Sequence, residues 1–221
     1  KAFRTFDNLL QRRFKTTPEL IQIVADSCKL ASQRTLSCGK NNLPDSEFLN
    51  VFPGEHYRFL NAIVEITNAK KIVEIGTFTG MGTLSLKEGF RDVSVNTYDI
   101  IKWHGLNVPS HFESNDFNES LRQVIGDLSD EKFFDSNLEI LNDADLIFMD
   151  APKDNVFEYV MAKHFKKLKK KNKKILILDD IAFVNMIDFW RNIKSPKIDA
   201  SSLAHWSGTG IVDISNGFLY D

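Results

Sequence analysis

Charged side chains are concentrated at two points where an apolar run ends. Asp150, Lys153 and Asp154 follow the run 146–149, and Asp179-Asp180 follows the run 175–178. If these runs are adjacent parallel strands, the carboxylates converge at the carboxyl edge of the sheet, where open α/β sheets bind ligands. Carboxylates that converge require a positive partner, and a hard divalent cation such as Mg²⁺ takes oxygen ligands. The pattern therefore predicts a divalent-metal site formed by Asp150, Asp179 and Asp180.

A turn rich in glycine follows the apolar run 72–75. It reads Gly-Thr-Phe-Thr-Gly-Met-Gly from Gly76 to Gly82, a spacing of G-x-x-x-G-x-G. Glycine removes the Cβ atom where a chain bends tightly, and the amides at the start of the next helix are left facing a bound molecule. Dinucleotide folds use a different spacing, G-x-G-x-x-G. The turn predicts a ligand site of another kind, and a glycine turn without a ligand is the alternative.

Two further acids follow the next two apolar runs. Asp99 comes about twenty residues after the glycine turn, where a carboxylate can accept hydrogen bonds from both hydroxyls of a ribose. Asp127 follows the third run in the sequence Ile-Gly-Asp, where it could contact the same ligand or stabilise a turn.

Apolar runs alternate with helix-period segments from Lys71 onward, which predicts an α/β fold with a parallel sheet. Several runs are apolar at consecutive positions, as expected for strands covered on both faces. The five runs are 72–75, 93–98, 123–125, 146–149 and 175–178. Two more strand-like segments, 197–203 and 210–214, are separated by a short loop and predict an antiparallel pair.

The first fifty residues differ in character from the rest. Thr17-Pro18-Glu19 provides an N-cap and a first-turn proline for a helix that is expected to run into the early thirties. The apolar face of this helix could cover a substrate pocket, join a homodimer or pack on the core. We expect residues 1–53 to form an N-terminal helical extension and 54–221 to form the main domain, with a soft boundary near Pro53-Gly54.

Glu-Ile-Gly-Thr-Phe-Thr-Gly from Glu74 and Asp-Ala-Pro-Lys-Asp-Asn from Asp150 resemble segments of class I S-adenosylmethionine-dependent methyltransferases, in particular the cation-dependent O-methyltransferases of the caffeoyl-coenzyme A and catechol type. The resemblance covers roughly residues 53–181. It implies a Rossmann-like, doubly wound, mostly parallel seven-stranded sheet with an antiparallel last strand. Carried over by position, it makes the following residues cofactor-binding: Glu74, Gly76, Thr77, Phe78, Gly80, Gly82, Thr83, Asp99 and Asp127.

The same resemblance assigns the chemistry. Asp150, Asp179 and Asp180 would hold the metal, and Lys153, with Asp150 beside it, would remove the proton from the attacking hydroxyl. Asp180 stands where the family usually has Asn. Metal coordination lowers the pKa of a hydroxyl, and we expect nearby cations and partial burial to lower the pKa of Lys153 so that it can act as a base.

The resulting hypothesis is methyl transfer from S-adenosylmethionine to a hydroxyl of a small molecule, either a catechol-like phenol or a sugar diol, with Mg²⁺ as the expected metal. Two alternatives stay open. The chain could be a metal-independent methyltransferase acting on a protein or another small acceptor. It could also be a non-catalytic adenosyl-binding module, which would have no need of Lys153.

Composition restricts partners and location. The net charge of −2 argues against nucleic acid, and no apolar stretch approaches the roughly 20 residues that span a bilayer. Because the start of the chain lacks the apolar core of a signal peptide, we predict a cytoplasmic protein. Cys28 and Cys38 are expected to be free thiols.

The remaining polar candidates carry weaker signals. The lysines between 163 and 174 are interpreted as a solvated helix end, with a basic binding patch as the alternative. His104, His111 and His205 lie in expected loops and could line a pocket, although solvated loop histidines are more common. His56 and His164 are given no role.

Overall fold

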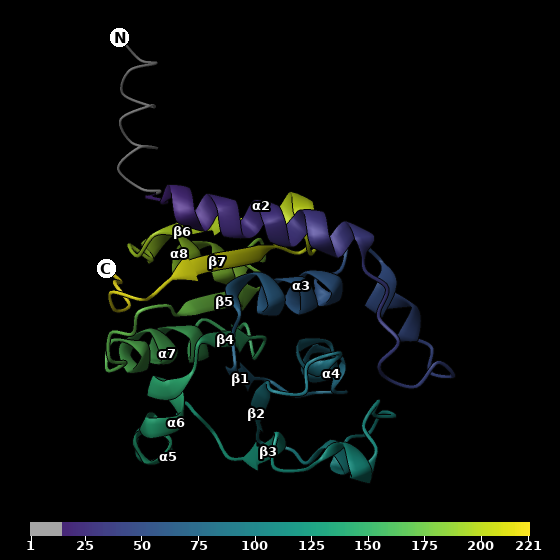
Figure 1. Cartoon of the computed structure of the whole chain (residues 1–221). Helices are drawn as coiled ribbons and strands as arrows, with labels where there is room; N and C mark the ends of the chain where they lie inside the picture. Colours follow the sequence, from purple (N-terminus) through teal and green to yellow (C-terminus); the bar gives the residue numbers. More distant parts are fainter. Residues whose placement is uncertain (1–14) are drawn as a thin grey trace.

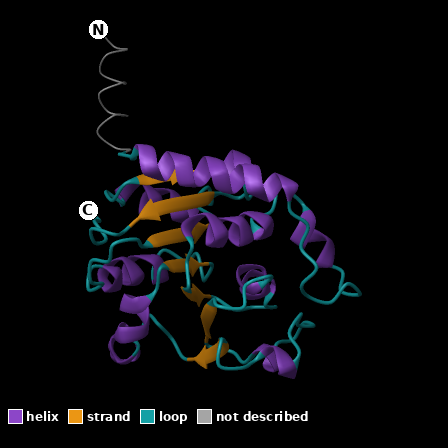
Figure 2. Cartoon of the chain, viewed as in Figure 1, coloured by secondary structure: helices purple, strands orange, loops and turns teal. Residues whose placement is uncertain are grey.

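A computed structural model describes residues 15–221 of the 221-residue chain, and these form one seven-stranded sheet with helices on both faces (Figures 1 and 2). The strand order is β3-β2-β1-β4-β5-β7-β6. The strands are β1 (Lys71–Ile75), β2 (Ser94–Asp99), β3 (Leu121–Ile125), β4 (Leu146–Met149), β5 (Ile175–Asp179), β6 (Lys197–Asp199) and β7 (Thr209–Asp213).

The direction of the strands confirms the predicted Rossmann-like fold. Strands β1 to β5 are parallel to their neighbours in this group, whereas β7 runs antiparallel to both β5 and β6. Because β1 lies between β2 and β4, the strand order reverses at its carboxyl end, which is where sheets of this type form a ligand crevice. Asp179 at the end of β5 pairs with Thr209 at the start of β7.

Two apolar cores lie on opposite faces of the sheet. Alternating strand residues point to opposite faces, so Ile72 belongs to one core and Val73 to the other. The first face is covered by α2 (Pro18–Gln33), α3 (Tyr57–Thr67) and α4 (Met81–Lys87). The second is covered by α5 (Glu131–Ser136), α6 (Leu138–Asp143), α7 (Phe157–Phe165) and α8 (Val184–Asn192). Burial on both faces explains why the strands are apolar at successive positions.

Helix α2 begins and ends as the sequence predicts. The Leu20 amide donates to Thr17 Oγ1 at 3.1 Å, which caps the helix, and Pro18 occupies its first position. The apolar side of α2, with Leu20 and Val24, packs into the first core against α3. The part of the predicted N-terminal extension that precedes Lys15 lies outside the described residues.

The segment 197–203 departs from its prediction as a single strand. It is extended only to Asp199, because Asp199 Oδ1 accepts the Ser201 amide at 3.0 Å and turns the chain into a 3-10 helix, Ser201–Leu203. The pairing of β6 and β7 that follows is antiparallel, as predicted.

The lysine-rich end of α7 is bound to neighbouring elements. Lys167 lies 2.8 Å from each of two carboxylates of α5, those of Glu131 and Asp135. Lys174 is fully buried, and its Nζ donates to two carbonyl oxygens in the last turn of α6 at 2.7 and 2.9 Å. Burial lowers the pKa of Lys174 to about 8. These contacts give the segment the structural role favoured by its place at a helix end.

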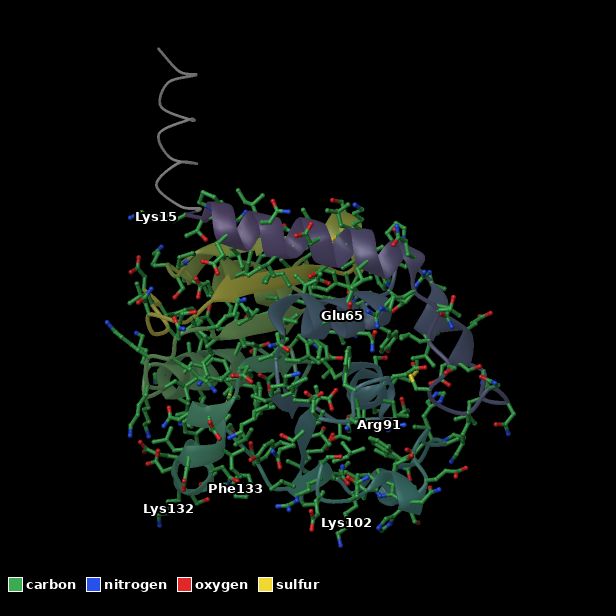
Figure 3. The ribbon with its side chains drawn as sticks, in the orientation of Figure 1. Lys15, Glu65, Arg91, Lys102, Lys132 and Phe133 are labelled. Atoms are coloured by element: carbon green, nitrogen blue, oxygen red, sulfur yellow. The ribbon has the colours of Figure 1, made fainter. Side chains whose placement is uncertain are left out.

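Elsewhere, basic side chains are spread over the surface; the labelled Lys15, Lys102 and Lys132 lie at separate places in Figure 3.

Cys28 and Cys38 are both free thiols, as predicted. Between residues 15 and 221, no helix combines the length and apolar character that crossing a membrane requires.

Candidate active site and metal centre

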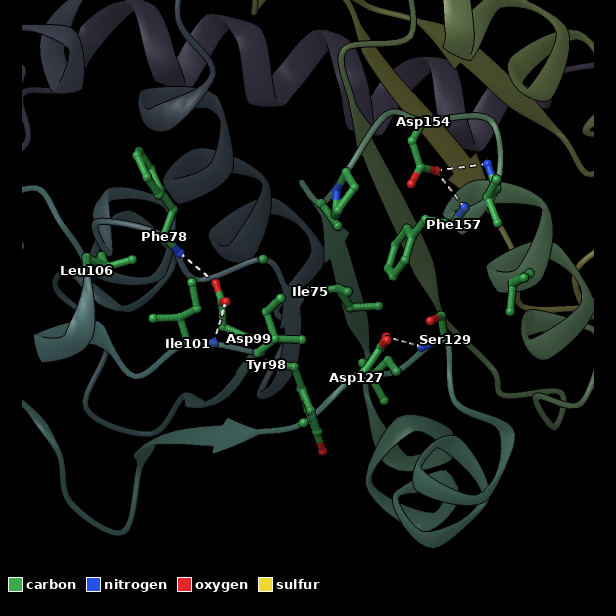
Figure 4. Close-up of a pocket in the computed structure, with 18 residues that line it drawn as sticks. Ile75, Phe78, Tyr98, Asp99, Ile101, Leu106, Asp127, Ser129, Asp154 and Phe157 are labelled. Carbon is green, nitrogen blue, oxygen red and sulfur yellow. Dashed lines mark hydrogen bonds between the residues drawn. The ribbon is translucent and has the colours of Figure 1, made fainter.

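A cavity of about 450 Å³ opens at the carboxyl ends of the central strands (Figure 4). Its volume lies in the range of roughly 300–1,000 Å³ that is typical of small-molecule sites. The walls come from the segments that follow β1, β2, β3 and β4, and are mostly apolar: Ile75, Tyr98, Ile100, Ile101, Leu106, Leu128, Ala151, Pro152, Val156, Phe157 and Val160. The predicted residues Gly76, Phe78, Asp99 and Asp127 also line this cavity.

Asp99 fixes the glycine turn to the end of β2. Its Oδ2 accepts the amides of Thr77 and Phe78 at 2.9 and 3.1 Å, and its Oδ1 accepts the Ile101 amide at 3.0 Å (Figure 4). Phe78 adopts a left-handed backbone with φ 42° and is 62% exposed beside the cavity. A carboxylate has about four acceptor sites, so Asp99 can accept these three amides and still accept one hydrogen bond from a ligand.

The glycines of this turn allow close contacts within the protein. A Cβ built on Gly76, whose φ is 99°, would lie 1.7 Å from the Asp150 carbonyl oxygen. A Cβ on Gly80 would lie 2.4 Å from the Phe112 ring, and one on Gly82 would lie 2.5 Å from a Glu74 carboxylate oxygen. The sequence predicted that the backbone of this turn approaches a ligand closely. In the structure, the atoms that leave no room for a Cβ belong to the protein itself.

Glu74 lies beneath the turn and is almost fully buried. The Thr83 hydroxyl donates to its carboxylate, while burial raises the pKa of Glu74 to about 8. Five of the predicted cofactor residues are therefore placed outside the cavity lining, in the layer that supports it: Glu74, Thr77, Gly80, Gly82 and Thr83.

The segment 101–120, an insert between β2 and β3, supplies part of the cavity wall and its support. Ile101 and Leu106 line the cavity, and Phe112 packs against Gly80. His111 is buried; its Nδ1 accepts the Lys40 amide at 3.1 Å and its Nε2 lies 3.0 Å from an Asp45 carboxylate oxygen. His111 thus has a structural role, connecting the insert to the segment before α3.

Asp127 and Asp154 both stabilise local backbone at the cavity rim. Asp127 Oδ1 accepts the Ser129 amide at 2.8 Å, the turn role that its sequence context allowed. Asp154 Oδ1 accepts two amides at the start of α7, at 2.8 and 2.9 Å.

The three predicted metal-binding acids gather beside this cavity, at the ends of β4 and β5. Lys153 lies among them: its Nζ forms an ion pair with Asp150 and lies 2.9 Å from Asp180 Oδ2. Asp180 has φ 59°, a left-handed conformation that Asp and Asn tolerate better than most residues. This backbone conformation explains how Asp can occupy a position at which the family usually has Asn.

The predicted lowering of the Lys153 pKa is wrong for this arrangement. Burial would lower this pKa, but the carboxylates of Asp150 and Asp180 outweigh burial and hold it above its ordinary value. Lys153 is therefore an ammonium ion here. Burial and the neighbouring Asp179 raise the pKa of Asp150, which lies at the same edge.

Two histidines complete the cluster: His205, which the sequence offered only as a loop histidine that could line a pocket, and His56, to which it assigned no role. His205 Nδ1 lies 2.8 Å from Asp179 Oδ1, and its Nε2 lies 3.3 Å from Glu55 Oε2. His56, immediately before α3, places its Nδ1 3.3 Å from the same Asp179 oxygen. Burial would raise the pKa of Asp179, but the two imidazoles hold it well below its usual range. No spacing in the sequence connects His56 with His205, so their convergence on Asp179 could not be predicted.

The donor set fits a divalent cation. Among the described residues, three groups of side chains hold their ligand atoms within 4.8 Å of one another: Glu55 with His56 and His205; His56 with Asp150 and Asp179; and Asp179 with Asp180 and His205. Each group contains carboxylate oxygen, the donor that hard cations prefer. Each also contains imidazole, which was not part of the predicted set.

Sequence comparison identifies the family of this chain. A family model described as O-methyltransferase matches residues 41–187, about two thirds of the chain. The chain belongs to the O-methyltransferase family. This confirms the predicted membership among class I S-adenosylmethionine-dependent O-methyltransferases. No curated protein matches this O-methyltransferase.

Solved structures share its fold at low sequence identity. A candidate caffeoyl-CoA O-methyltransferase from Staphylococcus aureus is 17% identical, with a TM-score of 0.53 over 84% of this chain and 95% of its own. A candidate O-methyltransferase from Klebsiella pneumoniae has 16% identity and a TM-score of 0.48, covering 97% and 96% of the two chains. An O-methyltransferase from Bacillus cereus in complex with SAH has 17% identity and a TM-score of 0.48, covering 90% of each. The first of these supports the fold assignment.

Proposed function

We propose that this enzyme transfers a methyl group from S-adenosylmethionine to a hydroxyl of a small acceptor, with a divalent cation at the acidic cluster. The observation that carries the proposal is the contact between the glycine turn and the first acid: a Cβ on Gly76 would overlap the Asp150 carbonyl oxygen. Ala151 and Pro152, which follow Asp150, line the cavity. A ligand in the cavity and an acceptor at the cluster would therefore be neighbours, as a direct displacement requires.

The cavity has the features needed by an adenosyl ligand. Asp99 keeps an acceptor site for a ribose hydroxyl, while Asp127 follows β3, the strand next to β2. Apolar side chains that line the same cavity, including Ile100, Leu128 and Phe157, can cover an adenine ring. Gly76 lines the cavity at the point where the turn meets Asp150.

The rim beyond the acids favours a planar acceptor. Trp206 is 72% exposed and Phe183 is 47% exposed, and their ring centroids lie 6.3 Å apart next to His205. Large exposed aromatic side chains beside a polar cluster are characteristic of binding surfaces. Of the two acceptors compatible with the sequence, a phenol therefore fits this rim better than a sugar diol.

Lys153 is the proposed proton acceptor for the attacking hydroxyl. A divalent cation held by Asp150, Asp179 and Asp180 would lower the pKa of a bound hydroxyl and compete with Lys153 for two of its carboxylate partners. Lys153 can take a proton at Nζ only when it is neutral, so its base role requires that Asp150 and Asp180 be engaged elsewhere. The Asn185 side chain donates to the Lys153 carbonyl at 2.8 Å and positions this segment.

The experiment compares Lys153→Met with Lys163→Met, a change to an exposed lysine of α7. We expect kcat with a catechol substrate to fall by about 10²–10⁴ in the first variant only, since proton transfer contributes about that factor. Affinity for S-adenosylhomocysteine, measured by calorimetry, should stay unchanged in both. Full turnover by Lys153→Met would remove the base assignment, and failure of the wild type to bind the cofactor product would remove the proposed function.

A further inference from the structure

His56 is a buried histidine with a charged neighbour and no hydrogen bond that meets normal geometry within the described residues. Its side chain is 3% exposed, and neither ring nitrogen makes a hydrogen bond within the described residues, although Nδ1 lies 3.3 Å from Asp179 Oδ1. Leaving a buried polar group without a hydrogen bond destabilises the folded protein. An imidazole kept in this state beside a carboxylate indicates a ligand that binds both.

His205 approaches the same carboxylate from another element. It lies in the loop before β7, with Nδ1 2.8 Å from Asp179 Oδ1 and 4.0 Å from Asp180 Oδ1. The ring centroids of His56 and His205 are 4.8 Å apart. Asp179 is therefore flanked by two imidazoles, one from the segment before α3 and one from the loop before β7.

The charges of this cluster favour a cation. Four carboxylates gather there, those of Glu55, Asp150, Asp179 and Asp180, whereas Lys153 is the one lysine that pairs with them among the described residues. Carboxylate oxygen binds Mg²⁺, Mn²⁺ and transition metals, but imidazole nitrogen suits transition metals and is a poor ligand for Mg²⁺. The donor types present therefore bear on which cation the site prefers.

We propose that the metal site of this enzyme is a mixed imidazole–carboxylate site, in which His56 and His205 supply nitrogen ligands beside Asp179. Such a site binds a first-row transition-metal dication, such as Co²⁺ or Mn²⁺, in preference to Mg²⁺. This inference rests on the proposed cation site at the acidic cluster and replaces the Mg²⁺ expected from the sequence. It does not depend on the identity of the acceptor.

The first test uses the wild-type full chain after removal of bound metals. Pulsed electron paramagnetic resonance of the chain loaded with one equivalent of Mn²⁺ should detect coupling to imidazole nitrogen. Titration with Co²⁺, followed by its visible absorption, should give tighter binding than Mg²⁺ measured by competition. Absence of nitrogen coupling, or binding of Mg²⁺ as tight as that of Co²⁺, would overturn the inference.

The second test uses His56→Gln and His205→Gln, with His104→Gln as a matched control at an exposed position of the short 3-10 helix Trp103–Gly105. We expect each cluster variant to weaken Co²⁺ binding by about tenfold or more and to leave Mg²⁺ binding within about threefold. Equal weakening of both ions would contradict nitrogen ligation. Binding of S-adenosylhomocysteine serves as the control for folding. The two proposals are tested separately, because loss of methyl transfer with retained Co²⁺ selectivity would overturn only the proposed function.

Discussion

Replacing Gly76 by Ala tests whether the glycine turn is determined by its contact with the end of β4. Gly76 has φ 99°, and an added Cβ would lie 1.7 Å from the Asp150 carbonyl oxygen. Gly217 has nearly the same φ, 96°, but a Cβ there would meet no atom within 4 Å. The two substitutions share the backbone strain and differ in the overlap, so Gly217→Ala is a matched control.

The backbone strain of an Ala at such a φ costs about 1–2 kcal/mol, which is the effect expected for Gly217→Ala. Gly76→Ala adds an overlap with a main-chain atom that cannot rotate away, and overpacking of this kind costs about 1–3 kcal/mol or more. We therefore expect a total loss of about 2–5 kcal/mol in the free energy of unfolding for Gly76→Ala. That is a large part of the roughly 5–15 kcal/mol typical of a domain.

Urea denaturation measures the difference between the two variants. With a slope of about 2 kcal/mol per molar urea, the midpoint of Gly76→Ala should lie about 1 M below that of Gly217→Ala. If the two variants unfold within about 0.5 kcal/mol of each other, the contact between the turn and Asp150 does not determine this glycine. The proposed adjacency of cofactor cavity and acidic cluster would then lose its main support.

Three further predictions follow. Asp99→Asn should weaken S-adenosylhomocysteine binding about 10- to 100-fold in calorimetry, because hydrogen bonds to a charged group contribute about 1.5–3 kcal/mol, whereas Asp127→Asn should have a smaller effect. Glu74, whose pKa is raised to about 8, binds its proton more tightly in the folded state, so wild-type stability should fall as pH rises from about 4.5 to 8. Glu74→Gln should remove that fall, which is on the order of 5 kcal/mol, and identical pH profiles of unfolding would contradict the shift. Complete chelation of divalent ions should abolish turnover and leave binding of the cofactor product intact, and turnover that survives chelation would favour the metal-independent alternative.

The sheet could be predicted because its signals are local and repeated. Strand β5 is apolar at four successive positions and is followed by two acids, so its type, its burial and the polarity of its end are all visible in the sequence. The N-cap at Thr17 is equally local. The end of β6 could not be predicted in this way. Because the Asp199 side chain accepts a backbone amide, β6 ends earlier than the apolar pattern indicated.

The site could be predicted only where its residues follow strands in sequence order. Asp150, Asp179 and Asp180 were found because the ends of adjacent strands converge, which follows from the topology. His56 and His205 are about 150 residues apart and come from a helix start and a loop, and no spacing rule connects such positions. The pKa of Lys153 was misjudged for a related reason, since its direction depends on which carboxylates reach its Nζ in three dimensions.

The reversed direction of β7 has a consequence for how this enzyme can change its substrate. Since Thr209 at the start of β7 pairs with Asp179 at the end of β5, the loop that enters β7 is delivered to the reactive edge. A strand running the other way would begin at the far end of the sheet. His205 thus reaches the acids, with the exposed Trp206 beside it, from a loop that does not line the cavity. Under the proposed function, substitutions in that loop would change the choice of acceptor and leave methyl-donor binding at the ends of β1 to β4 unaltered.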